Sequence, residues 1–310
     1  MPTKRPSTSL YFSKVLALPG AQAVVAGHLV SEKDEPTATV VLRIADGQWG
    51  LVGKIPDIVY AMTLNHSEGH GGAPSFGILG REGYFAVFGA GATEFVDPIV
   101  RGHPAYLEGL ACNEGIFSAC GSQRQVLRHT ERGWSRIDED IYIPFEGSPS
   151  GFLLGIAVRS PSELFVCGSE GFAATWNGTR WSRIEIPTNM DLNSVYCSKN
   201  GNTYFAGAAG SLFALRVGGQ IHDMSNSMVS KNAIYDIVEF QGGLYIATGS
   251  ELVRVRDDQS ELIPVPPSPN GDLAWIYSLS AGESLWCVGD EYVREFDGSS
   301  WVVHECPANK

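Results

Sequence analysis

A glycine at the end of an apolar stretch recurs seven times in this chain, and this repeat limits the possible folds more than any other feature. Around each glycine, an apolar stretch ends, a turn follows and a second apolar stretch begins, as in residues 164–175. The seven glycines are Gly27, Gly80, Gly121, Gly168, Gly207, Gly249 and Gly289. Their successive spacings are 53, 41, 47, 39, 42 and 40 residues. Such a period indicates a chain built from repeated supersecondary units.

A second sequence mark, a large aromatic or aliphatic residue, follows each of these glycines at a similar interval. It falls at Trp49, Phe95, Trp134, Trp181, Ile221, Leu262 and Trp301. The successive spacings are 46, 39, 47, 40, 41 and 39 residues. Two independent marks therefore agree on seven repeats.

Each repeat reads as four short strands. Apolar and polar residues alternate with period two, and Gly, Asn or Asp residues separate the runs. The pairs Asp46–Gly47, Asn177–Gly178 and Asp297–Gly298 predict type I′ hairpins, which need positive φ at both central residues. Four strands in about 40–45 residues are typical of a propeller blade. We therefore predict an all-β fold, a seven-bladed β-propeller with four-stranded antiparallel blades. A β-sandwich array is disfavoured because its domains need about 100 residues each.

The repeat predicts a single propeller domain over residues 1–310. The expected blades cover about 11–57, 58–104, 105–151, 152–189, 190–233, 234–273 and 274–306. Both terminal repeats contain a complete set of four strands, so we expect the first and last blades not to share a strand.

The last hairpin carries a family resemblance. Residues 297–301 read Asp-Gly-Ser-Ser-Trp. The chain resembles bacterial seven-bladed propellers with Asp-Gly-x-x-Trp turns and, in repeat length, WD40 proteins. The resemblance implies the propeller fold already predicted from the spacing.

The net charge and the apolar runs disfavour nucleic acid and membrane as partners. Lys and Arg number 22 and Asp and Glu 34, a net charge of −12. A broad nucleic-acid footprint is not expected, because such a surface would repel phosphates. No apolar run approaches the roughly 20 residues that a membrane helix needs. The first ten residues lack an apolar stretch, so we expect no secretory signal and a cytoplasmic location.

Long loops between strands 2 and 3 and between blades are the candidate binding surface, because these two kinds of connection share one propeller face. Acidic side chains there would steer a basic partner, and aromatic ones would anchor it. The predicted partner-binding residues are Glu32, Asp34, Glu35, Asp138, Glu139, Asp140, Tyr142, Phe145 and Glu146.

No catalytic, metal or cofactor site is predicted. The sequence has no nucleophile elbow, P-loop or dinucleotide fingerprint. The six cysteines form no C-x-x-C pair, and we expect them to be buried as small apolar residues. The His66–His70 segment, the most metal-like part of the chain, is predicted to be a polar loop. Arginines recur in the third strands, at Arg43, Arg128, Arg216, Arg254 and Arg294, and are predicted to pair with neighbouring acids as part of the scaffold.

These observations favour a non-catalytic, protein-binding propeller. Its most specific form is an acidic immunity or inhibitor protein that caps a basic toxin enzyme, because a nuclease-like active site is built to hold phosphates. Two alternatives stay open. One is a propeller hydrolase or lyase that uses Glu170, Glu251 and Glu291 at the tunnel mouth. The other is a carbohydrate-binding propeller.

Overall fold

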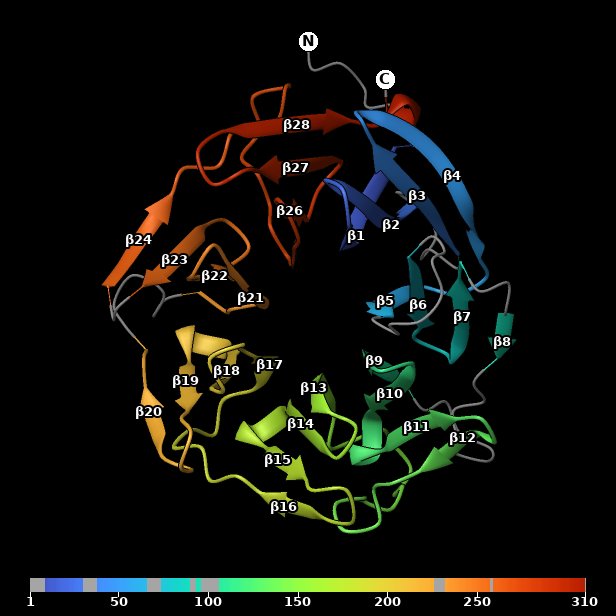
Figure 1. The fold of residues 1–310 in the computed structure, drawn as a ribbon, viewed down its shortest axis with the longest axis vertical. Coiled ribbons are helices and arrows are strands. Elements are labelled where there is room, and N and C mark those ends of the chain that lie inside the picture. Colours follow the sequence, from blue (N-terminus) through green and yellow to red (C-terminus); the bar gives the residue numbers. More distant parts are fainter. Residues whose placement is uncertain are drawn as a thin grey trace. The chain divides into compact units, whose positions relative to one another are not determined.

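The computed structural model describes residues 9–29, 38–65, 74–89, 93–95, 106–225, 232–256 and 259–309. These residues form seven antiparallel sheets of four strands each, and each sheet takes its strands from consecutive positions in the chain (Figure 1). Among the residues described, helix is limited to four single 3-10 turns. The predicted fold class, an all-β seven-bladed β-propeller, is confirmed.

The chain divides into two compact units. Unit 1 contains residues 1–59 and 238–310, and unit 2 contains residues 60–237. The divisions fall within two residues of the starts of β5 (Val59–Asn65) and β21 (Asp236–Phe240), so blades 1, 6 and 7 belong to unit 1 and blades 2 to 5 to unit 2.

Unit 1 contains twelve strands in three blades. Blade 1 is β1 (Leu10–Leu18), β2 (Gln22–Leu29), β3 (Thr39–Ala45) and β4 (Gln48–Ile55). Blade 6 is β21 (Asp236–Phe240), β22 (Gly243–Ala247), β23 (Leu252–Arg256) and β24 (Gln259–Ile263). Blade 7 is β25 (Ser278–Ala281), β26 (Leu285–Val288), β27 (Tyr292–Phe296) and β28 (Trp301–Glu305), followed by the 3-10 turn η4 (Pro307–Asn309).

Unit 2 contains four blades. Blade 2 is β5 (Val59–Asn65), β6 (Ser75–Gly80), β7 (Tyr84–Phe88) and β8 (Thr93–Phe95). Blade 3 is β9 (Leu107–Asn113), β10 (Ile116–Gly121), η1 (Ser122–Arg124), β11 (Val126–Thr130) and β12 (Gly133–Arg136). Blade 4 is β13 (Leu153–Ser160), β14 (Glu163–Gly168), η2 (Ser169–Gly171), β15 (Ala173–Trp176) and β16 (Trp181–Arg183). Blade 5 is β17 (Leu192–Cys197), β18 (Thr203–Gly207), η3 (Ala208–Gly210), β19 (Leu212–Leu215) and β20 (Ile221–Asp223).

The repeated glycines lie within two residues of the ends of the second strands, and the second mark lies on the fourth strand of every blade. In blades 3, 4 and 5 the position requires glycine because the backbone at the start of strand 1 passes too close for a side chain. An added Cβ would lie 2.0 Å from the Tyr106 carbonyl oxygen at Gly121, and 1.9 Å from that of Phe152 at Gly168. At Gly207 the corresponding distance, to a carbonyl oxygen of blade 5, is also 1.9 Å.

The cores form between neighbouring blades, which explains why the inner strands are apolar on both faces. In β14, Leu164 and Val166 pack in a cluster that includes blade 3. The alternate residues Phe165 and Cys167 pack in a cluster that includes blade 5. The period-two geometry of a strand thus distributes one apolar run between two cores.

In unit 1, the first and last blades pack side by side and exchange no strand, as predicted. The Phe12 amide donates to the Asp290 carbonyl at 2.9 Å. The Asn309 side chain hydrogen-bonds to both backbone groups of Leu10. It accepts from the Leu10 amide at 2.7 Å and donates to the Leu10 carbonyl at 3.0 Å. The C-terminal turn therefore holds the start of β1.

The type I′ prediction is right for one hairpin and wrong for two. Asp46 and Gly47 both have positive φ, as that turn requires. At Asn177–Gly178 and Asp297–Gly298 only the glycine does. The reason is an Asx turn: the Asp297 carboxylate, for example, accepts from the amides of Ser299 and Ser300, both at 2.7 Å. These loops are two residues longer than a type I′ hairpin.

Candidate functional site

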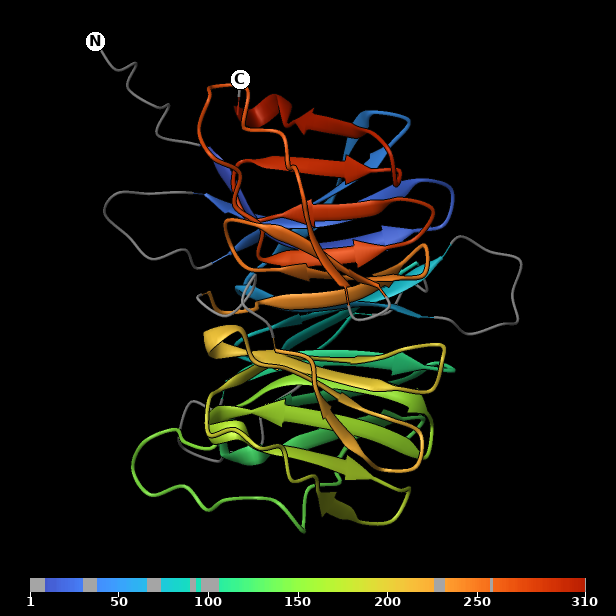
Figure 2. The same ribbon diagram turned by 90° about the vertical axis from the view of Figure 1, so that its left-hand side faces the viewer.

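The predicted loop 138–146 lies at one end of the sheets of unit 2. In a four-stranded antiparallel sheet, the turn between strands 2 and 3 and the connection that leaves strand 4 lie at the same end. Figure 2 shows the green connection between blades 3 and 4 on the same side as η1, η2 and η3. The loop thus belongs to the class of connections that the sequence singled out.

Backbone hydrogen bonds hold this loop against η1. The Gln123 backbone amide donates to the Ser150 carbonyl at 2.6 Å, and the Arg124 backbone amide donates to the Gly151 carbonyl at 2.8 Å. The Ile143 amide donates to the Gln123 carbonyl at 2.9 Å. The connection between the two blades is therefore a docked surface element rather than a loose insertion.

Asp138 differs from its predicted role because it is buried. Its side chain is 1% exposed and accepts from the Val126 amide at 2.8 Å. The Arg136 guanidinium binds the same carboxylate through Nε and Nη2, both at 2.9 Å. Burial raises the pKa of Asp138, while the bonds from Arg136 and Val126 act in the opposite direction. Asp138 anchors the start of the loop and does not offer its carboxylate to a partner.

The other described residues of the predicted set do reach the surface. Asp140 is exposed and also accepts from the Trp181 amide at 2.9 Å. Glu139 and Glu146 are exposed, and Tyr142 and Phe145 are half-buried. Glu32, Asp34 and Glu35 lie outside the described residues. The role of this set in binding stays a prediction.

Exposed large hydrophobic side chains reveal surfaces that the sequence interpretation missed. Those on the described residues are Leu29, Leu51, Met190, Val217, Tyr235, Leu262, Leu273, Trp275 and Val302. Met190, Tyr235, Leu273 and Trp275 all lie in connections between blades, and Leu29 lies at the end of β2. The sequence does contain a signal for these exposed residues, namely an apolar residue directly after turn-forming residues. Leu273, for example, follows the sequence Asn-Gly-Asp.

The third-strand arginines take part in the scaffold where their partners are seen. Arg254 forms an ion pair with Glu261 on the adjacent strand. Arg294 is fully buried and pairs with Asp290 at 2.9 Å. The prediction of a pairing role is confirmed for these two.

The acids of the enzyme alternative are distributed over both units. Glu170 is exposed in η2 of unit 2, whereas Glu251 and Glu291 are half-buried in unit 1.

Within the described ranges no three His, Cys, Asp or Glu side chains gather as a metal site. The segment 66–72 lies outside those ranges. None of the described helices is long and apolar enough to cross a membrane.

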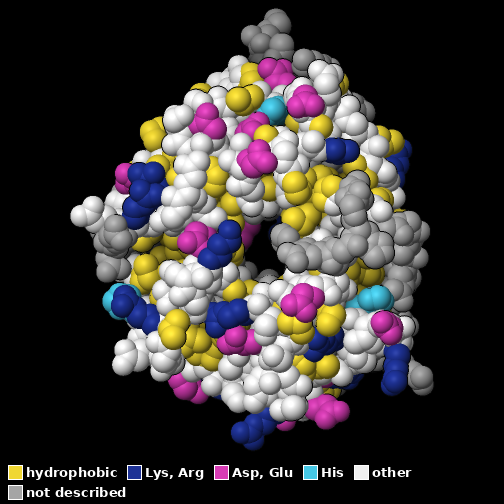
Figure 3. Space-filling view, viewed as in Figure 1, with side chains coloured by type: hydrophobic (Ala, Val, Ile, Leu, Met, Phe, Trp, Pro, Cys, Tyr) yellow, Lys and Arg dark blue, Asp and Glu magenta, His cyan; other side chains and the backbone are white. Residues whose placement is uncertain are grey.

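Figure 3 shows positive, negative and hydrophobic side chains interspersed over the visible face of each unit. Among the side chains of the described residues on that face, no continuous basic surface is visible in either unit.

The cysteines are free thiols, and all except Cys197 are buried. Burial raises the pKa of Cys112 to about 12 and that of Cys197 to about 11. The pKa values of Cys120 and Cys167 are also raised by burial. A free cysteine has a pKa of about 8.5, so these four carry little thiolate at neutral pH.

We expect the native protein to react slowly with a thiol reagent such as Ellman's reagent at pH 8. All six cysteines should react at once in guanidinium chloride. Free glutathione in the same buffer is the control for reagent activity. A native thiol that reacts as fast as glutathione would contradict the burial and would support a catalytic cysteine.

Comparison with known proteins shows similarity to a curated protein in sequence and to solved structures in fold. No known protein-family model matches the chain. The immune protein Tsi7 of Pseudomonas aeruginosa is 25% identical over 264 residues, which are 83% of this chain and 84% of Tsi7. Virginiamycin B lyase from Staphylococcus aureus superposes with a TM-score of 0.69 at 12% identity, over 92% of both chains. The WD40 propeller domain of Doa1 superposes with a TM-score of 0.68 at 13% identity, over 96% of both chains. The two structural likenesses show the propeller fold alone.

Proposed function

We propose that this chain is an immunity protein, a non-catalytic propeller that binds a toxin and blocks it. The observation that carries the proposal is the similarity to the immune protein Tsi7, which extends over most of both chains. A propeller offers a rigid scaffold on which connecting loops carry the binding residues. The similarity in sequence thus covers most of the scaffold rather than one motif.

The net charge supports a basic toxin as the partner. A net charge of −12 accelerates encounter with a positively charged protein and disfavours acidic ones. The exposed apolar residues on connections between blades supply the anchor side chains that protein interfaces use. We further propose that the toxin is an enzyme whose active site binds phosphates, and that the encounter takes place in the cytoplasm.

Growth protection tests this proposal. Each gene that flanks the one encoding this chain is expressed in a sensitive bacterial host, with and without this chain. We expect one neighbouring product to arrest growth and this chain to restore it, with the two proteins co-purifying near one to one. A destabilised variant, Gly168→Ala, serves as the control and should protect poorly. If no neighbouring product is toxic, or if the toxicity persists in the presence of this chain, the proposal is wrong.

A further inference from the structure

We propose that residues 268–277 of unit 1, which we call the Trp275 loop, dock a Lys- or Arg-rich segment of a protein partner. The inference rests on the proposed function, because it names the chemistry of the partner surface. It concerns a different surface from loop 138–146.

The Trp275 loop exposes two large apolar side chains. Leu273 is 77% exposed and Trp275 is 46% exposed. The Tyr277 ring is stacked against Trp275, with 6.0 Å between ring centroids and 12° between the planes. Exposed apolar groups of this size add little to the core, and tryptophan is among the residues most enriched at binding hot spots.

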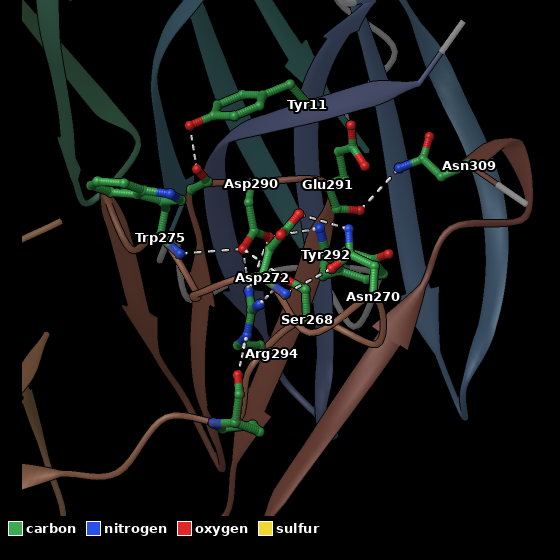
Figure 4. A network of polar contacts seen from close by, with 12 residues as sticks. Tyr11, Ser268, Asn270, Asp272, Trp275, Asp290, Glu291, Tyr292, Arg294 and Asn309 are labelled. Carbon is green, nitrogen blue, oxygen red and sulfur yellow. Dashed lines mark hydrogen bonds and ion pairs between the residues drawn. The ribbon is translucent and has the colours of Figure 1, made fainter. Parts of the chain in front are cut away.

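A buried arginine holds the base of this loop (Figure 4). Arg294 is 0% exposed, and each of its guanidinium nitrogens has a partner. Nε donates to the Pro266 carbonyl at 3.1 Å, Nη2 to the Ser268 hydroxyl at 2.9 Å, and Nη1 to Asp290 at 2.9 Å. The guanidinium thus joins the loop to the turn that precedes β27.

Further hydrogen bonds fix the backbone on both sides of the tryptophan. The Trp275 amide donates to the Asp290 carboxylate at 3.2 Å. Ile276 exchanges two backbone bonds with Gly249 of blade 6, at 2.7 and 3.1 Å. The Tyr277 amide donates to the Val288 carbonyl at 2.8 Å. A loop held in this way loses little conformational entropy on binding, so its exposed side chains are pre-organised.

The charge around the loop selects the partner. The charged side chains on the described segments 247–252, 264–277 and 289–291 are Glu251, Asp272, Asp290 and Glu291, and none on these segments is basic. Asp290 is paired with Arg294, so Glu251, Asp272 and Glu291 supply the acidic character. Residues 238–310 contain 12 acidic and 4 basic side chains, a net −8 of the chain's −12. The nearby Arg294 is buried and fully bonded within the fold.

Carboxylates beside an exposed indole form the surroundings that a Lys or Arg side chain prefers. The cation is attracted to the ring face, and nearby acids add charge complementarity. Apolar neighbours such as Leu273 exclude water from the contact. The occupant is therefore a basic segment with apolar residues interspersed.

Fluorine NMR tests the surface without knowledge of the toxin. The full chain is labelled with 5-fluorotryptophan, and the Trp275 signal among the seven tryptophans is assigned with Trp275→Phe. The probe is a short peptide that alternates Arg and Leu, and its control has Glu in place of Arg. We expect the Arg peptide to shift the Trp275 signal at low salt and not at high salt. An absent shift, an equal shift with the Glu peptide, or a shift that depends on protein concentration alone would overturn the proposal. The last result would indicate a second copy of this chain as the occupant.

Variants then test the surface in toxin binding. Trp275→Ala should weaken affinity for the neutralised toxin roughly 10- to 100-fold. Leu273→Ser, at a more exposed position, gives a second variant that leaves the core unchanged. Val302→Ala is the matched control, since Val302 is 51% exposed on β28 of the same unit. Melting curves establish that all three variants fold.

The two proposals fail in distinguishable ways. If the wild-type chain neutralises the toxin and Trp275→Ala does so equally well, the Trp275 loop is not the docking surface, and the immunity function stands. If no toxin is neutralised but the Arg peptide shifts the Trp275 signal, the immunity function is wrong and the basic-segment surface stands.

Discussion

Replacing Arg294 with methionine should lower the free energy of unfolding by about 3–5 kcal/mol, the largest effect we expect from a single side chain. Methionine approximates the volume of the arginine but leaves the carboxylate of Asp290 in a buried site without its counter-charge. It also removes the bonds to Pro266 and Ser268 that hold the Trp275 loop. Urea unfolding followed by circular dichroism measures the change.

Arg254→Met is the matched control for Arg294→Met. Arg254 also pairs with an acid of its own blade, but its side chain is partly exposed. Exposed ion pairs contribute about 0–1 kcal/mol, so this variant should unfold near the wild-type midpoint. The double variant Asp290→Asn with Arg294→Met should recover part of the lost stability, because it removes the unpaired charge. Equal losses of unfolding free energy in the Arg254 and Arg294 variants would contradict the prediction, because they would show that the buried ion pair stabilises the fold no more than the partly exposed one.

Gly168→Ala should lower the free energy of unfolding by about 3 kcal/mol. Its Cβ would lie 1.9 Å from the Phe152 carbonyl oxygen, a separation that no rotamer change can relieve. The strand 1 backbone would have to move, and the bond from the Ser169 amide to the same oxygen, now 2.9 Å, would be strained. Thermal and urea unfolding measure the loss.

Gly50→Ala is the control for the glycine prediction. An added Cβ at Gly50 meets nothing within 4 Å, and this glycine does not have positive φ. The substitution should change stability by no more than about 0.5 kcal/mol. If Gly168→Ala were as mild as Gly50→Ala, the close approach of strand 1 would not be the reason for the repeated glycine.

The two candidate surfaces show which features of a binding surface local sequence patterns can predict and which they cannot. Loop 138–146 was predicted because its length and its mixture of acids and aromatics are visible in the sequence itself. The burial of Asp138 was not predicted, because it depends on the Val126 amide, 12 residues away along the chain. The exposure of Trp275 was missed for a similar reason. A tryptophan between apolar residues reads as part of a strand, yet β25 begins only at Ser278.

The sequence by itself determined the number of blades, the four strands in each and the position of the strand 2 glycine. These features repeat with a short period and depend on contacts within one blade or with its nearest neighbour. Only the tertiary structure decided which acids face solvent and which are buried, and which tryptophan is presented at the surface. The physical reason is that the exposure of a side chain depends on individual contacts that the repeat pattern does not encode. An example is the bond from the Trp275 amide to the Asp290 carboxylate, which Arg294 also binds.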